Sequence, residues 1–429
     1  MKVTLISPNQ ISGIAGKYPN LGIGYLAAVL EKNEIDAKIW DISASSLSNR
    51  DLQIKLEREK PDIVGITSNS FTFLHTKKIA QTIKKITPNT KIVIGGPQAT
   101  LYPRETMFNL EFDVAIHGEA EISLPNLIGN ISKENFKDIN GISYREGENV
   151  IVNPPEKLIK DIDSIPFPAR HLMPMKKYFS PIAREVPYNM MITSRGCPFS
   201  CTYCAPIGGK KFRVRSPTNV VDEIEELTSE YGIKELQFYD DSFSVKKERV
   251  IQICDEIINR GLDFQWDART RVDIIDEELL RKMKGAGCTR IRYGVEAGDQ
   301  KVLDIMNKNI TPEQVKEAVS LTQKIGGIEI LTYFMIGTPG ETLETIHKTI
   351  SLAKELNTDH VRFNITNANP GTQMYQDALM KGVFSEDYWV QYARGELEYI
   401  PELFFETEEY TKKDLEKIVK YAYSECQKK

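Results

Sequence analysis

The sequence predicts an α/β fold with three parts: an N-terminal doubly wound parallel sheet of the Rossmann type, a partial (β/α)6 barrel and a small C-terminal α-rich region. Two stretches of the chain alternate short β-rich runs with amphipathic helical patterns, which is typical of parallel βα units. A proline-rich segment separates these stretches. The 429 residues are enough for two or three domains of about 150 residues each.

The same patterns divide the chain into four segments. We expect the sheet domain at 1–130, a connector at 131–188, the barrel at 189–380 and a capping region at 381–429. The connector has many prolines and only short strand patterns, so we expect it to lie along a surface. The capping region is rich in aromatic side chains, and we expect them to pack over the mouth of the barrel.

Five short β-rich runs predict the strands of the first sheet: 2–7, 37–42, 62–68, 91–96 and 113–118. In a parallel sheet of this kind the ligand lies beyond the carboxyl ends of the strands. The residues at these ends are the candidates for ligand binding: Pro8, Asn9, Ser68, Asn69, Ser70, Gly95, Gly96, Pro97, His117, Gly118 and Glu119. The glycines after the first strand are too late and wrongly spaced for G-x-G-x-x-G, which disfavours a nicotinamide dinucleotide.

A second series of βα units begins near residue 190. Its predicted strands are 189–194, 235–240, 264–269, 290–296, 329–337 and 360–366. Six repeats fit a parallel barrel that is two units short of the full eight. Catalytic groups are expected at the carboxyl ends of these strands.

Three of the six cysteines stand directly after the first barrel strand, in the motif Cys197-x3-Cys201-x2-Cys204. A structural zinc site takes four protein ligands, and no second cysteine pair is available to complete one. A thioredoxin-like redox pair would have no use for the third thiol. Three thiolates on an iron–sulfur cluster leave one iron open to a ligand from outside the protein. The remaining cysteines are expected to be packing residues: Cys254, Cys288 and Cys426.

This C-x3-C-x-aromatic-C motif, with Tyr203 as the aromatic residue, resembles that of the radical S-adenosylmethionine (SAM) superfamily. The resemblance implies a 4Fe–4S cluster that is held by Cys197, Cys201 and Cys204. Its open iron would bind the amino and carboxylate groups of SAM. An electron from the cluster would then cleave the C5′–S bond of SAM and give a 5′-deoxyadenosyl radical.

The resemblance extends to the ends of the later strands, where it implies a set of SAM-binding residues: Tyr203, Asp240, Asp241, Arg269, Glu296, Ile336 and Gly337. The two aspartates of "YDDSF" stand where the superfamily often has Gly-Gly-Glu, and they would bind the methionine amino group. Arg269 would pair with the carboxylate, although a structural salt bridge is the alternative. Glu296 would contact the ribose or the amino group, although a solvated charge at the strand end is the alternative. The backbone at Ile336 and Gly337 would meet the adenine, although a glycine there also suits an ordinary turn.

The N-terminal domain resembles the cobalamin-binding domain of cobalamin-dependent radical SAM enzymes, on "PNLGIGYLAAVLEKN", "VGITSNSF", "IVIGGPQAT" and "AIHGEAE". The D-x-H-x-x-G loop that supplies a cobalt-binding histidine is absent after the first strand. The resemblance therefore implies cobalamin bound without that histidine. Its nucleotide tail would descend between strand ends that carry small residues. His117 is expected near the corrin edge rather than on the cobalt.

Methylcobalamin and a radical-forming barrel together imply a methyltransferase that acts on an unactivated carbon. An oxidative cyclase or rearrangement enzyme of the same architecture is the alternative. A non-catalytic sensor is disfavoured by the open iron, and a transfer-RNA methylthiotransferase by the absence of cysteines from residues 1–190. The expected partners are a small-molecule or peptide substrate and an electron donor of the flavodoxin or ferredoxin type.

Composition limits the partners and the location. The formal net charge is −5, so the chain has no electrostatic footprint for nucleic acid. The first residues lack the apolar run of a signal peptide, and no window reaches the roughly 18 apolar residues of a membrane-spanning helix. We expect a cytoplasmic protein without a nucleic-acid partner or a membrane span.

Overall fold

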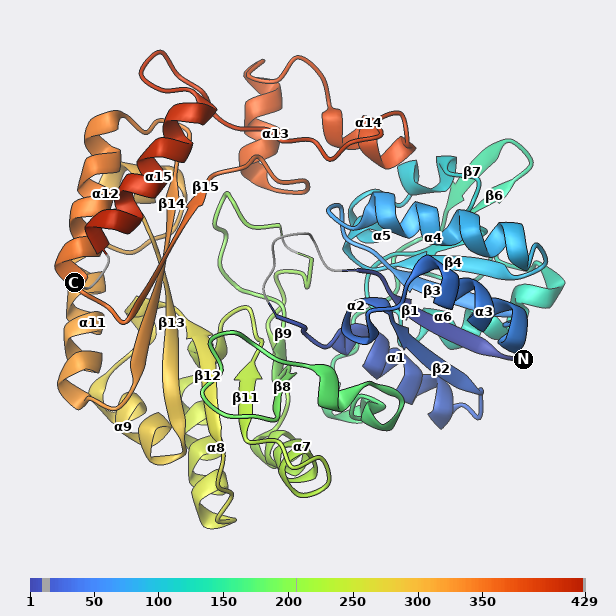
Figure 1. Cartoon of the computed structure of the whole chain (residues 1–429), viewed down its shortest axis with the longest axis horizontal. Helices are drawn as coiled ribbons and strands as arrows, with labels where there is room; N and C mark the ends of the chain where they lie inside the picture. The colour runs from blue at the N-terminus through green and yellow to red at the C-terminus, as the bar shows by residue number, and fades with distance from the viewer. Residues whose placement is uncertain (10–15, 206, 427–429) are drawn as a thin grey trace. The chain divides into compact units, whose positions relative to one another are not determined.

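The computed structural model describes residues 1–9, 16–205 and 207–426 and divides into two compact units (Figure 1). The first unit combines Met1–Asn189 with Glu386–Pro401, and the second combines Met190–Ser385 with Glu402–Lys429. The chain therefore passes between the units at three points along its sequence.

The first unit is built on a seven-stranded sheet with the order β2-β1-β3-β4-β5-β6-β7. The first five strands pair in parallel: β1 (Val3–Ser7), β2 (Ala37–Asp41), β3 (Ile63–Thr67), β4 (Lys91–Gly95) and β5 (Val114–Ile116). Every residue of β1 is buried, as expected for a central strand that is covered on both faces. The predicted doubly wound parallel sheet is confirmed, and its strand order reverses between β1 and β3.

The predicted connector contributes two further strands to this sheet. β6 (Ile142–Glu146) and β7 (Asn149–Val152) form a hairpin, and β6 pairs antiparallel with β5. The rest of the connector contains short turns. Its backbone contacts the helix α1 (Leu21–Lys32), because the Ala169 N–H donates to the Gly24 carbonyl at 3.0 Å.

Helices cover both faces of the first sheet. They are α1 (Leu21–Lys32), α2 (Ile42–Ser45), α3 (Asn49–Glu59), α4 (Phe73–Ile86), α5 (Pro97–Leu101) and α6 (Ser123–Asn130). α1 packs beside α6 and α3 packs beside α4. The side chains of α1 and α6 share one apolar core with the sheet.

The second unit contains a six-stranded sheet with the order β15-β14-β13-β12-β11-β8. Its strands are β8 (Tyr188–Met191), β11 (Glu235–Phe238), β12 (Gln265–Thr270), β13 (Cys288–Glu296), β14 (Glu329–Ile336) and β15 (His360–Ile365). Neighbouring strands from β11 to β15 pair in parallel, in sequence order. The partial six-stranded barrel of the prediction is confirmed.

Helices alternate with these strands. They are α7 (Pro217–Ser229), α8 (Lys247–Asn259), α9 (Glu277–Gly285), α10 (Gln300–Ile305), α11 (Pro312–Ile325), α12 (Leu343–Leu356) and α13 (Gln373–Met380). Local sequence sets their starts: α11 begins with a capping box between Thr311 and Gln314 and has Pro312 at its first position. A short antiparallel pair, β9 (Ser194–Arg195) with β10 (Arg213–Val214), brackets the cysteine loop.

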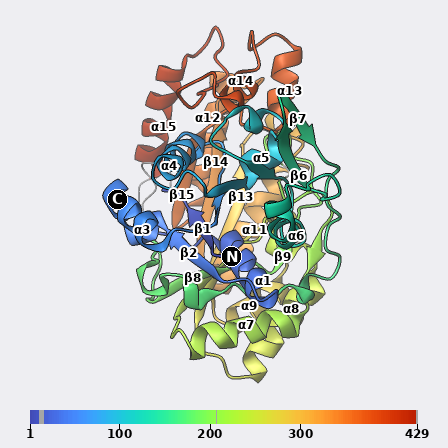
Figure 2. The same cartoon turned by 90° about the vertical axis from the view of Figure 1, so that its right-hand side faces the viewer.

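The C-terminal region divides between the units. α15 (Lys412–Cys426) lies along β15 and α12 in the second unit, where Figures 1 and 2 both show it. α14 (Tyr388–Arg394) belongs to the first unit, so its buried Trp389 and Tyr392 pack there. Within the described ranges, no helix is long and apolar enough to cross a membrane.

Candidate active site

The cysteine loop starts at a backbone position that only glycine suits. Gly196 has a φ of +79°, and a Cβ there would lie 2.5 Å from the Lys211 carbonyl oxygen. The next residue, Cys197, donates its N–H to the Gly209 carbonyl at 3.1 Å. These contacts close the loop at its base. Its chain from 197 to 204 carries three thiols at the carboxyl end of the first barrel strand.

The three thiols are free. Cys197 and Cys201 are half-buried and Cys204 is exposed. Partial burial of the sulfur atoms raises the pKa of Cys197 and that of Cys204, and the nearby Asp241 carboxylate contributes to both shifts, which bring the pKa of Cys204 to about 11. Such thiols stay protonated until a cation stabilises the thiolate. Among the described residues no three His, Cys, Asp or Glu side chains stand at metal-binding distances, so the thiols are not gathered as a ligand set. Three soft sulfur donors on one short loop fit an iron–sulfur cluster.

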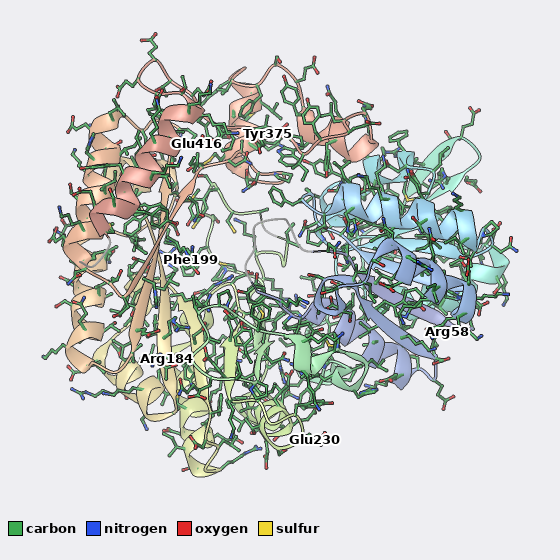
Figure 3. The ribbon with its side chains drawn as sticks, viewed as in Figure 1. Arg58, Arg184, Phe199, Glu230, Tyr375 and Glu416 are labelled. Atoms are coloured by element: carbon green, nitrogen blue, oxygen red, sulfur yellow. The ribbon has the colours of Figure 1, made fainter. Side chains whose placement is uncertain are left out.

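The segment after α10 clamps this loop. Thr202 donates its N–H to the Met306 carbonyl at 2.9 Å, and the Asn307 side-chain amide donates to the Ser200 carbonyl at 2.8 Å. Arg271 places its guanidinium 4.0 Å from the centre of the Phe199 ring, which is labelled in Figure 3. The same guanidinium donates to the Lys308 carbonyl at 2.7 Å. The position of the thiols is therefore set by contacts more than 60 residues away in sequence.

A hydrogen-bonded triad joins the half-buried Tyr203 of the loop to the buried Glu296 and Lys308. The Tyr203 hydroxyl donates to Glu296 Oε1 at 2.9 Å, and Lys308 Nζ contacts the same oxygen at 2.6 Å and the Tyr203 hydroxyl at 3.1 Å. Burial raises the pKa of Tyr203, so its hydroxyl stays a donor. Glu296 has a φ of +72°, a strained conformation for a residue other than glycine. The structure thus brings Tyr203 and Glu296 together, with Lys308 as their cation.

Sequence reasoning missed Lys308. It lies twelve residues after Glu296, beyond α10, in a polar stretch that resembles an ordinary helix end. The available signal was a lysine downstream of Glu296, and Lys301 offers the same signal. Spacing alone could not show that the chain turns back here and buries Lys308 to 6% exposure.

The two aspartates after β11 differ in their surroundings. Asp240 is buried and accepts three hydrogen bonds from its own scaffold: the Thr193 N–H at 2.6 Å, the Thr193 hydroxyl at 2.5 Å and the Ser194 hydroxyl at 2.7 Å. Its carboxylate therefore fixes the strand that leads into the cysteine loop. Burial raises the pKa of Asp241, and Asp240 adds to that shift while Arg269 opposes it. Arg269 lies over the Tyr239 ring, 4.4 Å from its centre.

The predicted adenine segment forms a tight turn after β14. Gly337 has a φ of +82°, and a Cβ there would lie 2.7 Å from the Leu415 side chain. Glu341 Oε2 accepts the Thr338 N–H at 2.7 Å and so holds the turn that follows Ile336 and Gly337. Glu341 is 3% exposed, and burial raises its pKa to about 7. Its other oxygen, Oε1, has no hydrogen-bond partner within the part of the chain that the structure describes.

In the first unit, the strand ends next to the reversal of strand order form a cradle of small residues. The Ser68 N–H donates to the Gly95 carbonyl at 2.8 Å, and Gln98 donates its N–H to the Ser68 carbonyl at 2.9 Å. Gly96 has a φ of +87°, and a Cβ there would lie 2.8 Å from the Ser68 carbonyl oxygen. The backbones of β3 and β4 thus meet at a distance that only glycine permits. Pro97 follows as the first residue of α5.

Two buried nitrogens border this cradle. The Ser70 hydroxyl donates to Gln98 Oε1 at 2.8 Å, whereas Gln98 Nε2 and His117 Nε2 have no hydrogen-bond partner among the described residues. Burial lowers the pKa of His117, so its ring is neutral near pH 7. Unpaired buried nitrogens beside a glycine cradle fit a large ligand with amide and phosphate groups, such as cobalamin.

The other predicted cobalamin residues lie at the same edge of the sheet. Asn69 caps the turn before α4 through its side chain, which accepts the Thr72 N–H at 3.0 Å. Gly118 donates its N–H to Thr100 Oγ1 at 3.0 Å, and Asn9 donates its N–H to His75 Nδ1 at 3.2 Å. Pro8 and Glu119 follow β1 and β5 in the chain. Residues 10–15, part of the stretch that lacks D-x-H-x-x-G, lie outside the described residues.

Comparisons with known proteins identify a family for each part of the chain. Residues 191–353 match the family model of the radical SAM superfamily, and residues 11–128 match that of the B12-binding domain. An uncharacterized methyltransferase of Pyrococcus horikoshii is 36% identical over 91% of this chain and 86% of its own length. The anaerobic magnesium-protoporphyrin IX monomethyl ester cyclase of Rubrivivax gelatinosus is 32% identical, over 88% of this chain and 70% of its own.

Among solved structures, the radical SAM methyltransferase TsrM of Kitasatospora setae, with cobalamin and a 4Fe–4S cluster bound, has a similar fold. The TM-score is 0.74 at 20% sequence identity, and the match covers 89% of this chain and 75% of that chain.

Proposed function

The chain belongs to the cobalamin-dependent radical SAM enzymes, and from that premise we propose that it transfers a methyl group to an unactivated carbon atom. The premise rests on the two family models and on the relatives. The observation that carries the proposal is a three-cysteine loop at the end of the first barrel strand of a chain whose first unit matches a B12-binding domain. The cofactors are a 4Fe–4S cluster, SAM and cobalamin.

We assign the three sulfur ligands of the cluster to Cys197, Cys201 and Cys204. When bound, the cluster supplies the electron that cleaves SAM, and cobalamin supplies the methyl group. Tyr203, Glu296 and Lys308 keep the cysteine loop in place against β13. Asp241, with Arg269 nearby, offers a carboxylate toward the methionine end of SAM, and the turn at Gly337 offers backbone groups toward the adenine. Asp240 supports the loop from inside, so we assign it a structural role beside its predicted contact with SAM.

In the first unit, the strand ends are proposed to hold the cobalamin through backbone groups and small side chains. Ser68, Gly95 and Gly96 provide the close approach of two backbones. The neutral ring of His117 and the amide of Gln98 provide unpaired nitrogens. Gln98 is an addition to the residues that the sequence predicted.

An oxidative cyclase of the same architecture is the second candidate, and the observation that favours it is the 32% identity to a magnesium-protoporphyrin ester cyclase. The two reactions change the mass of the substrate in opposite directions. Methylation adds one CH₂ unit, whereas cyclisation removes hydrogen atoms. A methyltransferase of this class also releases both S-adenosylhomocysteine and 5′-deoxyadenosine.

For partners, we propose a small-molecule or peptide substrate, a flavodoxin- or ferredoxin-type electron donor and no nucleic acid. The net charge of −5 supports the last point. A cytoplasmic location also remains part of the proposal, because an oxygen-labile cluster and free thiols suit a reducing compartment.

The test is anaerobic reconstitution with iron, sulfide and cobalamin, followed by reduction in the presence of SAM. We expect an absorbance band near roughly 400 nm, as for other thiolate-bound clusters, and production of 5′-deoxyadenosine. Extracts of cells with and without the gene, compared by mass spectrometry, would reveal the methylated product. A cluster that forms but leaves SAM intact would contradict the proposal.

A further inference from the structure

α14 comes from the far end of the chain yet completes the first unit. It begins more than 230 residues after β7, the last strand of the sheet, and it packs on the 3-10 turn Glu105–Phe108. Trp389 is 0% exposed and Tyr392 is 1% exposed. A seven-residue helix with two aromatic side chains so fully buried is a built part of the unit rather than a loose extension.

The buried face of α14 contacts the segment that follows β3. The Tyr392 hydroxyl donates to the Ser70 carbonyl oxygen at 2.7 Å. The Trp389 ring meets the Phe71 ring edge-on, with 6.1 Å between the ring centres, and the Tyr392 ring meets Phe73 in the same way at 5.6 Å. These three contacts therefore fall on Ser70, Phe71 and Phe73, where the chain enters α4.

A second set of contacts fixes the position of α14 from its C-terminal end. Asn109, which is 4% exposed, donates from its side-chain amide to the Ala393 carbonyl at 2.9 Å. Gly395 ends the helix with a φ of +81°, and a Cβ there would lie 2.4 Å from Asn109 Oδ1. The helix is thus held at both ends, so the Tyr392 hydroxyl is kept in a fixed position for its hydrogen bond to Ser70.

The contacted segment is the one that lies at the reversal of strand order. Ser70 also donates its hydroxyl to Gln98, and Ser68 lies against the Gly95–Gly96 backbone. The ligand of a doubly wound sheet lies beside this point. A hydrogen bond to the Ser70 carbonyl therefore restrains the backbone on which Ser68 and Ser70 are presented.

From these contacts we infer that Tyr392 is a positioning residue for cobalamin: its hydroxyl, delivered by α14, holds the Ser68–Ser70 loop in the conformation that receives the cofactor. The inference rests on the proposed function of the first unit. It adds a residue from the C-terminal region to a site otherwise built from the first 120 residues.

The test uses Tyr392→Phe in the full chain with its cluster reconstituted. This change removes one hydroxyl and keeps the ring that packs on Phe73. We expect binding of hydroxocobalamin, measured by equilibrium dialysis, to weaken about three- to tenfold, because one buried hydrogen bond is lost. The cluster absorbance should stay unchanged. Tyr399→Phe is the matched control, because Tyr399 lies in the same segment and is 59% exposed.

The outcomes separate the inference from the proposed function. Equal cobalamin affinity for Tyr392→Phe and the unaltered chain would overturn the inference alone. This holds even if the variant lowers the melting temperature of the cobalamin-free protein, because that result would assign the hydroxyl a purely structural role. Absence of cobalamin binding by the unaltered chain would overturn the proposed function and the inference with it. Should Tyr392→Phe fail to fold, Asn109→Ala, which removes the hydrogen bond that holds α14 at the Ala393 carbonyl, must weaken binding in the same range.

Discussion

The proposed ligand sites of the two units are built by different means. The first unit uses backbone groups, glycines and small neutral side chains at the ends of β3 and β4. The second unit uses thiols and a buried network of charged side chains, in which Lys308, Glu296 and Tyr203 share one cluster of hydrogen bonds. A substitution therefore acts through backbone strain in the first unit and through unpaired charge or a lost ligand in the second. This difference predicts effects of different size on different cofactors.

The largest expected effect is that of Cys201→Ala. It removes one of the three thiols of the loop, which are the proposed sulfur donors. We expect loss of the absorbance near roughly 400 nm and of SAM cleavage, while cobalamin still binds the first unit with unchanged affinity. Cys426→Ala is the control, since this half-buried thiol lies on α15 outside the loop. Loss of cobalamin binding in Cys201→Ala would break the comparison between the units.

Next in size is Lys308→Met. The Glu296 carboxylate, which is 7% exposed, would lose its cation and stay buried. Removal of one partner from a buried ion pair costs about 3 kcal/mol. We expect a loss of that order in the free energy of unfolding, measured by denaturant titration, and weaker retention of the cluster. Lys316→Met breaks an exposed pair with Glu355, and it should cost about 1 kcal/mol or less. Equal losses for both variants would show that the triad is not structurally special.

Gly96→Ala tests the backbone-based site. Its Cβ would meet the Ser68 carbonyl at 2.8 Å in a left-handed conformation, so the loop must shift. We expect cobalamin affinity to fall about tenfold or more, from about 2 kcal/mol of strain, with SAM cleavage retained. Gly147→Ala is the control: it has a φ of +61° but no atom within 4 Å of the added Cβ. A similar loss of cobalamin affinity in Gly147→Ala would contradict the prediction, because it would show that the clash at Gly96 is not the cause of the loss.

The smallest expected effect is a pH dependence from Glu341. Burial raises its pKa to about 7 in the folded chain, from 4.5 in the unfolded chain, so the folded state holds the extra proton between these values. Stability should therefore fall as the pH rises, by about 1 kcal/mol between roughly pH 6 and 7.5. The free energy of unfolding at several pH values would measure it. Glu341→Gln should flatten the dependence of the free energy of unfolding on pH in this range. An unchanged slope in the variant would show that another group causes the pH dependence.

Much of the fold could be predicted from local patterns because β1 to β5 in the first sheet and β11 to β15 in the second pair in parallel, and helices stand between successive strands. The five parallel strands of the first unit and the six strands of the second were expected at nearly the observed positions. The hairpin of β6 and β7 was noticed as two short strand patterns. Its attachment to the edge of the first sheet depends on a pairing with β5, which no local pattern encodes.

The same limit applies to the sites. The iron–sulfur cluster could be predicted from the sequence alone, because the prediction depends only on the spacing of Cys197, Cys201 and Cys204. The role of Lys308 depends on a turn of the chain that brings it back to Glu296, and the role of Tyr392 on a contact across 322 positions. The aromatic residues of the C-terminal region were expected over the barrel, whereas Trp389 and Tyr392 pack in the first unit. An aromatic segment in a sequence indicates that its side chains will be buried, but it does not indicate which surface of the protein they will pack against.

The return of residues 386–401 to the first unit has a consequence for synthesis of the protein. Domains generally fold as they leave the ribosome, from the N-terminus onward. Here Phe71 and Phe73 must wait for Trp389 and Tyr392, which emerge when nine-tenths of the chain has been made. We therefore expect nascent chains that stop at Asn189 to expose these rings, to recruit chaperones and to aggregate when released.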